Sequence, residues 1–428
     1  MHYRFPIATA LTESLRGGYG SSVFKSDLAA GAVVALIALP LAMALAIAVG
    51  LPPQHGLYTA IVAGIVTALF GGSRFQVSGP TAAFVAILAP IVAQHGLQGL
   101  IWCQLMAGAL LILLGLLRLG RFISHVPYAV TTGFTAGIAV VIATLSLNDF
   151  FGLRIEHMGP HYWEKVAVIF QSLFHLSLSE TIIGSFSLAV MILLPRFTKA
   201  LPAPVIGVAA GTALSILAVR MGMPVDTIDS RFSYIAADGS QGAGIPPALP
   251  EFHLPAAMDI MPLLVPAVTV ALLAALESLL SATVADNITE TKHNPDSELV
   301  GIGFGNLLSG FFAGIPATGA LARTAANIHA GAKTPLASIY HALLLLVFML
   351  ALAPYISKIP MAALAALLLS TAWRMAHVHL VVDIVKVGNK QDTALLFVTF
   401  FLTVIFDMVA GVGAGLALAY IFHKAEKA

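Results

Sequence analysis

The sequence has little charge and almost no cysteine. Of 428 residues, 10% are charged and a single one, Cys103, is a cysteine, so no internal disulfide can form. The formal net charge is +1 and the basic residues form no cluster, which argues against a nucleic-acid partner. The N-terminus has no apolar core followed by a small-residue cleavage site, so we interpret it as a retained arm rather than a signal peptide.

Three kinds of chemical site are missing as well. The glycine-rich GVGAGLALA is not followed by the Lys-Ser/Thr pair of a phosphate-binding loop, which excludes nucleotide hydrolysis. The histidines show no metal-ligand spacing, so we expect neither a metal site nor another cofactor. The apolar segments lack the paired catalytic groups that an intramembrane enzyme needs. We therefore assign no catalytic residue and expect a protein that is not an enzyme.

Apolar residues dominate what remains. The sequence is 59% hydrophobic, with a mean hydropathy of +0.94, and a membrane helix needs about 20 apolar residues. Hydrocarbon offers backbone amides no partner, and the period of a barrel strand is absent, so the predicted fold class is an all-α polytopic membrane protein. Fourteen segments are predicted, over residues 28–49, 56–71, 79–94, 97–117, 126–147, 178–195, 203–220, 261–285, 298–314, 318–330, 335–353, 360–375, 392–406 and 409–423.

The basic residues indicate an orientation for these segments. With the N-terminus inside, fifteen lysines and arginines lie on the cytoplasmic side and five outside, which supports an even count with both termini in the cytoplasm of a bacterial inner membrane. The longest polar interval divides the chain. The predicted organisation is a cytoplasmic arm (1–26), a first repeat (27–220), an external loop (221–260), a second repeat (261–423) and a cytoplasmic stub (424–428).

The two halves show weak internal similarity. GLYTAIVAGIVTALFGG (56–72) aligns without gaps on ELVGIGFGNLLSGFFAG (298–314), and the same offset of 242 carries VSGPTAAF (77–84) onto GALARTAA (319–326). Seven segments per half is an odd number, so the second half must enter the membrane from the opposite side. The sequence therefore predicts a 7+7 inverted repeat, an arrangement common in carriers.

Two short segments, 79–94 and 318–330, each follow a stretch of glycine and proline. Irregular backbone is tolerated inside a membrane where it borders a cavity, so we predict two half-helices whose N-termini meet with unpaired amides. Such ends favour an anion, which would place it near Gly79, Thr81, Gly319 and Ala320, with Pro80 in a first helical turn. The alternative is that glycine and proline only kink ordinary helices.

Arg323 is a charged residue within the second of these segments, in PATGALARTAANIHAG. An intramembrane charge faces a cavity or a partner and indicates function; a structural arginine satisfied by a carboxylate and carbonyls is the alternative. Glu277, the acid within segment 261–285, is the predicted partner, and Ser281 lies on its helical face. An ionised Glu277 would cancel Arg323, whereas a protonated one would leave about two positive charges for a dianion. This arithmetic predicts coupling of a proton to the anion, with Glu277 and Ser281 as proton-coupling residues.

Several stretches together resemble the SulP anion transporter family over the whole length. They are DLAAGAVVALIALPLAMALA, PPQHGLYTAIVAGIVTALFGGSRFQVSGPTAAF, ALESLLSATVADN, ELVGIGFGNLLSGFFAGIPATGALARTAANIHAGAKTP and FDMVAGVGAGLALA. The resemblance implies a UraA-like fold in which a core domain (segments 1–4 and 8–11) moves against a gate domain (5–7 and 12–14), an elevator-like alternating access. It also implies that Leu41, Leu45, Leu321 and Ala322 line the site with Thr81, Ala320, Glu277 and Arg323.

The pair of Arg323 and Glu277 resembles the proton-coupled bacterial branch, and three further stretches resemble the DauA-like dicarboxylate branch. These are TKHNPDSELVG, PLAMALAIAVGLPPQHGLYTA and RFSYIAADGSQGAGIP. The expected function is symport of a proton, rather than sodium, with a small dicarboxylate such as fumarate, succinate or aspartate. A sulfate or bicarbonate symporter or exchanger is the alternative, and a nucleobase permease or a channel fits less well. The resemblance implies a cytoplasmic STAS domain after the last segment; this sequence stops before one, and the alternatives are a piece of a longer protein or a natural short form. Expected partners are the small anion and the lipid bilayer, and a homodimer is left open.

Overall fold

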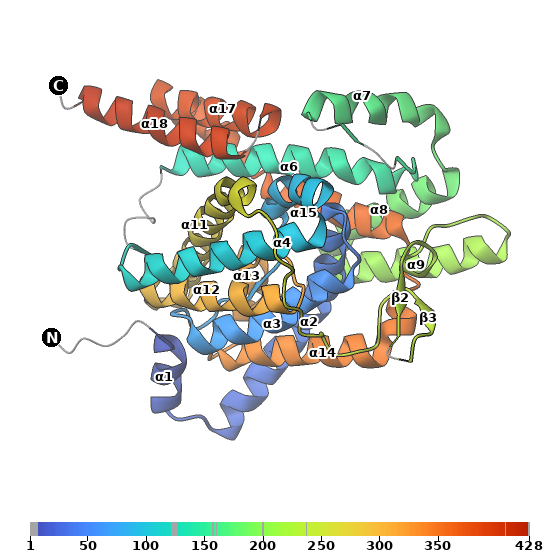
Figure 1. The fold of residues 1–428 in the computed structure, drawn as a ribbon, viewed down its shortest axis with the longest axis horizontal. Helices are drawn as coiled ribbons and strands as arrows, with labels where there is room; N and C mark the ends of the chain where they lie inside the picture. The colour runs from blue at the N-terminus through green and yellow to red at the C-terminus, as the bar shows by residue number, and fades with distance from the viewer. Residues whose placement is uncertain are drawn as a thin grey trace. The chain divides into compact units, whose positions relative to one another are not determined.

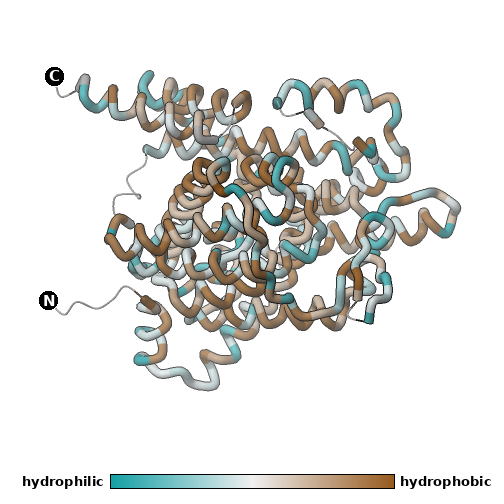
Figure 2. Tube along the Cα trace, in the orientation of Figure 1, coloured by the Kyte–Doolittle hydropathy of each residue, from teal (hydrophilic) through white to brown (hydrophobic). Residues whose placement is uncertain are grey.

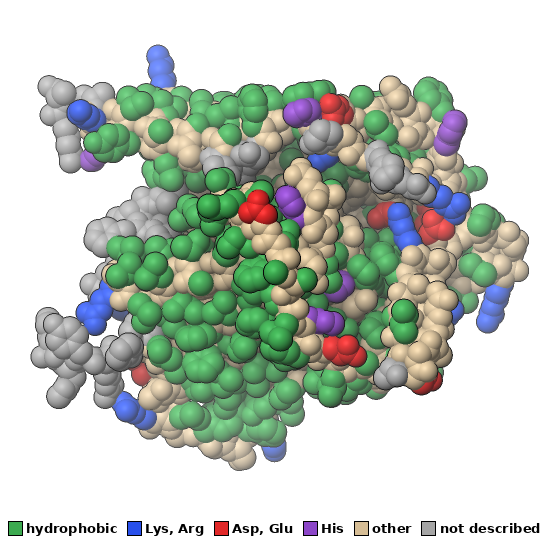
Figure 3. All heavy atoms as spheres, in the orientation of Figure 1, with side chains coloured by type: hydrophobic (Ala, Val, Ile, Leu, Met, Phe, Trp, Pro, Cys, Tyr) green, Lys and Arg blue, Asp and Glu red, His purple; other side chains and the backbone are tan. Residues whose placement is uncertain are grey.

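The protein is almost entirely helical. The computed structural model describes residues 7–120, 127–155, 158–159, 161–198, 201–236, 238–406 and 408–426. Among them, eight spans are long and apolar enough to cross a membrane: Ser21–Val49, Ala82–Leu116, Tyr128–Phe150, Leu178–Phe197, Ala203–Arg220, Met261–Thr289, Leu336–Ile356 and Met361–Val387. Apolar residues run along most helices (Figure 2), and hydrophobic side chains cover most of the face in Figure 3. The chain is a polytopic membrane protein, but fourteen crossings are not confirmed.

The helices form two compact units that interleave along the sequence. The first unit comprises residues 1–84, 91–125 and 232–356. Its described elements are α1 (Thr9–Arg16), α2 (Ser21–Val49), α3 (Gln54–Phe70), β1 (Ser78–Gly79), η1 (Ala82–Phe84), α4 (Val85–Leu116) from Ile91 on, β2 (Ser233–Ile235), β3 (Gln241–Ala243), η3 (Met261–Leu263), α11 (Leu264–Thr289), α12 (Pro295–Phe311), β4 (Thr318–Gly319), α13 (Leu321–His329) and α14 (Leu336–Ile356).

The second unit comprises residues 85–90, 126–231 and 357–428. Its described elements are the first turns of α4, α6 (Tyr128–Phe150), α7 (Tyr162–Ser172), η2 (Leu173–His175), α8 (Leu178–Phe197), α9 (Ala203–Arg220), α10 (Ile228–Arg231), α15 (Met361–Met375), α16 (Val378–Val387), α17 (Lys390–Ile405) and α18 (Met408–Glu426). Helix α6 packs against α15 and α17, and α17 lies beside α18 (Figure 1). The units divide the predicted segments as the family resemblance implies, except that residues 85–90 of predicted segment 79–94 fall in the second unit.

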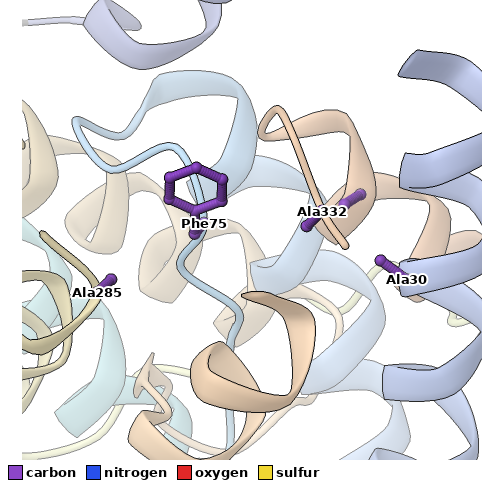
Figure 4. Close-up of a cluster of buried hydrophobic side chains, with 5 residues drawn as sticks. Ala30, Phe75, Ala285 and Ala332 are labelled. Atoms are coloured by element: carbon purple, nitrogen blue, oxygen red, sulfur yellow. The ribbon is translucent and has the colours of Figure 1, made fainter. Parts of the chain in front are cut away.

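In the first unit, α3 packs against α2, α12 and α14 (Figure 1). Small residues allow these backbones to approach closely, as is usual between membrane helices. A Cβ atom on Gly56 would lie 1.9 Å from the carbonyl oxygen of Ala42, so only glycine fits where α3 meets α2. Figure 4 shows Phe75, which follows α3, among Ala30, Ala285 and Ala332 from three other parts of this unit. These contacts fix the stretch that leads into β1.

Local sequence signals account for several helix ends. The Asn294 side chain accepts hydrogen bonds from the amides of Asp296 and Ser297 and so caps α12. Helix α2 ends at Gly50, whose φ of 92° is the left-handed value that glycine adopts most easily. Gly96, with a φ of 61°, interrupts α4 between the predicted segments 79–94 and 97–117. The break between those two segments was therefore correctly predicted.

Helices or strands extend into three of the predicted intervals, whose boundaries stay predictions. Helix α1 and the start of α2 occupy much of the predicted arm 1–26, of which residues 1–6 lie outside the described part. Helix α18 continues to Glu426 within the predicted stub, whose last two residues are outside it too. The predicted loop 221–260 contains α10, β2 and β3, and its residues are divided between the two units at Arg231 and Phe232. Short polar elements of this kind have too weak a periodicity to be seen in the sequence.

Candidate anion-binding site

The two predicted irregular stretches meet in the first unit. Strand β1 pairs antiparallel with β4, with Ser78 opposite Gly319 and Gly79 opposite Thr318. The chain then enters η1 on one side and α13 on the other. The prediction that these two helix starts lie together is confirmed. Pro80, however, precedes η1 instead of lying in a first helical turn, and its carbonyl accepts a hydrogen bond from Arg323.

Buried polar side chains hold both strands in place. The Glu298 carboxylate accepts hydrogen bonds from the Gly72 and Ser73 amides at 2.8 and 2.9 Å and from Gln76 Nε2 at 2.6 Å. On the other strand, Asn306 donates to the Ala317 carbonyl and accepts from its amide, both at 2.9 Å. Extended backbone inside a membrane protein needs such partners, because hydrocarbon supplies none. These bonds fix the pair of strands β1 and β4, which we call the strand crossing, so that it forms a rigid support for the residues beside it.

Arg323 lies beside this crossing and is 2% exposed. Its guanidinium donates to the Pro80 carbonyl, whereas its Nε has no partner. A Cβ on Gly79 would lie 2.6 Å from Nη1, so glycine is needed there to admit the guanidinium. An unpaired buried donor costs about 1–3 kcal/mol, and more on a charged group. Arg323 therefore matches the alternative of a structural arginine only in part, because one carbonyl and no carboxylate pairs with its guanidinium.

Glu277, on α11, is half-buried and accepts a hydrogen bond from Thr81 Oγ1 at 2.9 Å. Glu277 and its predicted partner Arg323 act on each other electrostatically but form no ion pair within 4.0 Å. The consecutive residues Pro80 and Thr81 instead hold Arg323 and Glu277, respectively. The opposite charges are thus brought close without cancelling each other in direct contact.

The backbone amides of the second stretch are only partly as predicted. The Gly319 amide donates to Ser278 Oγ at 3.0 Å and the Ala320 amide to the Val77 carbonyl at 2.9 Å, so the prediction that they are unpaired is wrong. Both amides donate to residues in or beside the paired strands. A prediction based only on the helix N-terminus does not include these partners. The following residues, Leu321 and Ala322, open α13 and are exposed, and no side chain caps that helix. The open positive end of the helix therefore begins one residue later.

The remaining predicted residues lie near this site in different ways. Ser281 is buried and its hydroxyl donates to Thr324 Oγ1 at 3.2 Å, which supports α13. No hydrogen bond joins Ser281 to Glu277, so its role in proton coupling stays a prediction. Leu41 and Leu45 follow Pro40 on α2, which packs against α13. Their contact with an anion stays a prediction.

Sequence reasoning missed several residues of this site. Ser278 and Thr318 bond each other at 2.8 Å and tie β4 to α11, and Thr324 accepts from the Val77 amide at 3.1 Å. Hydroxyl residues in apolar helices are too common to single these out. Glu298 and His341 are different, because an ionisable residue inside a predicted membrane segment is itself a signal that could have found them. His341, on α14, is completely buried.

Two surface cavities of the first unit lie away from the predicted residues. One, of about 310 Å³, is lined by Glu13, Arg74, Lys333 and their neighbours; the other, of about 280 Å³, is lined by Thr9, Lys292, Asp296 and theirs. Neither includes a predicted site residue. The features that indicate an anion site are the strand crossing, the charges of Arg323 and Glu277, and the uncapped N-terminus of α13.

Comparison with known proteins decides the family. The model of the sulfate permease family matches residues 24–399, which is most of the chain. The chain belongs to the sulfate permease family. A relative from Bacillus subtilis, named "Putative sulfate transporter YvdB", is 40% identical over 407 residues, covering 95% of this chain and 74% of its own. A bicarbonate transporter, BicA of Synechocystis, is 32% identical, over 93% of this chain and 69% of its own length.

Two solved structures share the fold of this chain. The transmembrane domain of a cyanobacterial bicarbonate transporter BicA matches with a TM-score of 0.77 and 29% identity, over 92% of this chain and 98% of that one. A structure of SLC26A9 matches with a TM-score of 0.86 at 19% identity, over 97% of this chain and 67% of that one, and shows the fold alone. This sulfate permease family member is accordingly an anion transporter. The sulfate and bicarbonate names support the sequence-based alternative better than the dicarboxylate prediction, and the DauA-like branch is not confirmed.

Proposed function

We propose that this transporter moves sulfate across the membrane together with a proton carried by Glu277. The observation that carries the proposal is Arg323, a buried positive charge with one donor unpaired, held beside a half-buried acid at an open helix start. A divalent oxyanion supplies several acceptors and two negative charges, which suits this arrangement. The 40% identity to a relative named for sulfate favours that anion over the dicarboxylates.

The proton couples to the anion through charge balance. When Glu277 is ionised, its charge opposes the entry of a dianion beside Arg323. When Glu277 is protonated, Arg323 and the α13 N-terminus, which contributes about half a charge, attract the dianion together. Thr81 can keep its hydrogen bond to Glu277 in both forms, because a carboxyl retains an acceptor oxygen after protonation. Proton and sulfate therefore bind as a pair.

Transport would proceed by movement of the first unit, which contains the crossing, relative to the second. The antiparallel pairing of β1 with β4 joins one stretch from each of the two predicted repeats. Bicarbonate is a second candidate anion, because this chain matches the transmembrane domain of the bicarbonate transporter BicA over 98% of that domain.

The test is uptake of radiolabelled sulfate into proteoliposomes under an imposed inward proton gradient. We expect accumulation above equilibrium, and Glu277→Gln should abolish its dependence on the gradient. The matched control is Glu251→Gln, which neutralises an exposed acid outside the site. Unlabelled bicarbonate, succinate, fumarate and aspartate compete in separate arms to rank the anions. Accumulation by Glu277→Gln against a sulfate gradient under the same pH difference would overturn the role of Glu277.

A further inference from the structure

Several buried polar atoms around the strand crossing have no hydrogen-bond partner among the described residues. They are Gln76 Oε1, Ser78 Oγ, Arg323 Nε, Asn327 Oδ1 and both ring nitrogens of His341. Buried polar groups are nearly always paired, with protein or with ordered water. Such a concentration of unpaired atoms in one region therefore indicates that something other than protein completes it.

Helix α14 places His341 at the level of this crossing. Ser338, one turn earlier, donates to the Gln76 carbonyl at 2.7 Å. A Cβ on Gly64 would lie 3.4 Å from Ala342 Cβ and 3.6 Å from the Ser78 carbonyl oxygen, which puts the turn around His341 close to Ser78. From α13, Asn327 donates to the Phe75 carbonyl at 2.9 Å and Arg323 to that of Pro80. Both helices therefore hold the same stretch, 75–80.

His341 is 0% exposed, and no partner satisfies either nitrogen. The Ser338 backbone, one turn earlier, lies near the ring but does not meet full hydrogen-bond geometry with either nitrogen. A neutral imidazole has one donor and one acceptor nitrogen, and a buried water needs two to four polar partners. An unpaired hydroxyl, a guanidinium N–H and an imidazole supply that number.

We propose that Ser78, Arg323 and His341 enclose a buried water site, and that His341 positions the Arg323 guanidinium through this water. Arg323 is the charged group whose field acts on the ring. On α2, which packs against α14, the Asp27 carboxylate is already engaged by the Lys333 and Thr334 amides and the Thr334 hydroxyl. The titratable residues of α3, also against α14, are His55 and Tyr58, and His55 bonds the Ala313 carbonyl.

The consequence for transport, which rests on the proposed function, concerns affinity. The neutral ring can accept a hydrogen bond from water that in turn accepts from Arg323 Nε, so the guanidinium keeps its other nitrogens for Pro80 and the anion. A charged ring would repel Arg323 instead. His341 is thus a positioning residue, and its loss should raise the KM for sulfate more than it lowers the maximal rate.

The experiment compares His341→Leu, which has no polar atoms, with His341→Gln, which keeps a donor and an acceptor. We expect Leu to raise the KM for sulfate about tenfold and to lower the thermal midpoint, and Gln to restore most of the affinity. His329→Leu, which replaces an exposed histidine on α13, is the matched control. A dry site predicts the opposite for His341→Leu, namely greater stability with unchanged KM, since an unpaired buried group is removed. That result would overturn the proposal.

A second measurement needs no transport. In protein labelled with ¹⁵N-histidine, the His341 ring signals, assigned by their loss in His341→Gln, should show hydrogen bonding at both nitrogens and magnetisation transfer from water. Ring nitrogens without water contact would refute the water site. If wild-type protein moves no sulfate yet shows this water contact, the proposed function fails and the site stands. If it transports sulfate and His341→Leu leaves KM unchanged, the positioning role fails.

Discussion

Gly79→Ala tests whether the close approach of Arg323 to the crossing matters for transport. The added Cβ would lie 2.6 Å from Nη1, whereas ordinary contacts begin at 3.4 Å, so the guanidinium must retreat by the difference, about 0.8 Å. Arg323 is 2% exposed and bonds the Pro80 carbonyl, so it has little space in which to do so. A hydrogen bond from a charged group contributes about 1.5–3 kcal/mol, and each 1.4 kcal/mol is tenfold.

We therefore expect the transport efficiency for sulfate to fall by about 10- to 100-fold, a size typical of a charged group misplaced by about 1 Å. The fold should survive, because overpacking costs about 1–3 kcal/mol and the backbone strain of an alanine at the Gly79 φ of 158° costs about 1–3 kcal/mol more. The assay is initial uptake into proteoliposomes at several sulfate concentrations, with thermal unfolding and size-exclusion profiles of the same preparations. Gly413→Ala is the control, since a Cβ there meets nothing within 4 Å. Uptake by a folded Gly79→Ala protein within about twofold of wild type would refute the reasoning.

Three further outcomes follow from the same structure. Arg323→Ala should reduce sulfate uptake at least about 100-fold while the protein still elutes as a folded species, because the positive charge is lost together with its unpaired donor; substantial uptake would remove Arg323 from the site. Glu298→Gln should lower the free energy of unfolding by about 3 kcal/mol, measured by thermal shift, because an amide cannot accept from the Gly72, Ser73 and Gln76 donors together; an unchanged midpoint would contradict that. Asp226→Asn, which breaks the exposed 2.8 Å ion pair with Arg154, should cost less than about 1 kcal/mol in the same assay.

The helix pattern and the positions of its interruptions could be predicted from the sequence. Long apolar runs leave few alternatives to a helix, and glycine and proline mark the breaks, as at Gly96 and in the stretches before η1 and α13. The family was likewise evident from its motifs, and the family match confirms it. The branch within the family was not evident from the sequence, because the choice of anion depends on a few side chains and their geometry.

The sequence by itself determined that Arg323 and Glu277 would be intramembrane charges and that two irregular stretches would meet, because burying a charge or an open backbone is costly enough to require a partner. Only the tertiary structure decided what those partners are. It uses the Gly319 and Ala320 amides in the crossing, separates Arg323 from Glu277 through Pro80 and Thr81, and brings His341 from α14 to the same stretch. Hydrogen bonds between residues 41 to 262 positions apart depend on how helices pack, and no local pattern in the sequence records that packing.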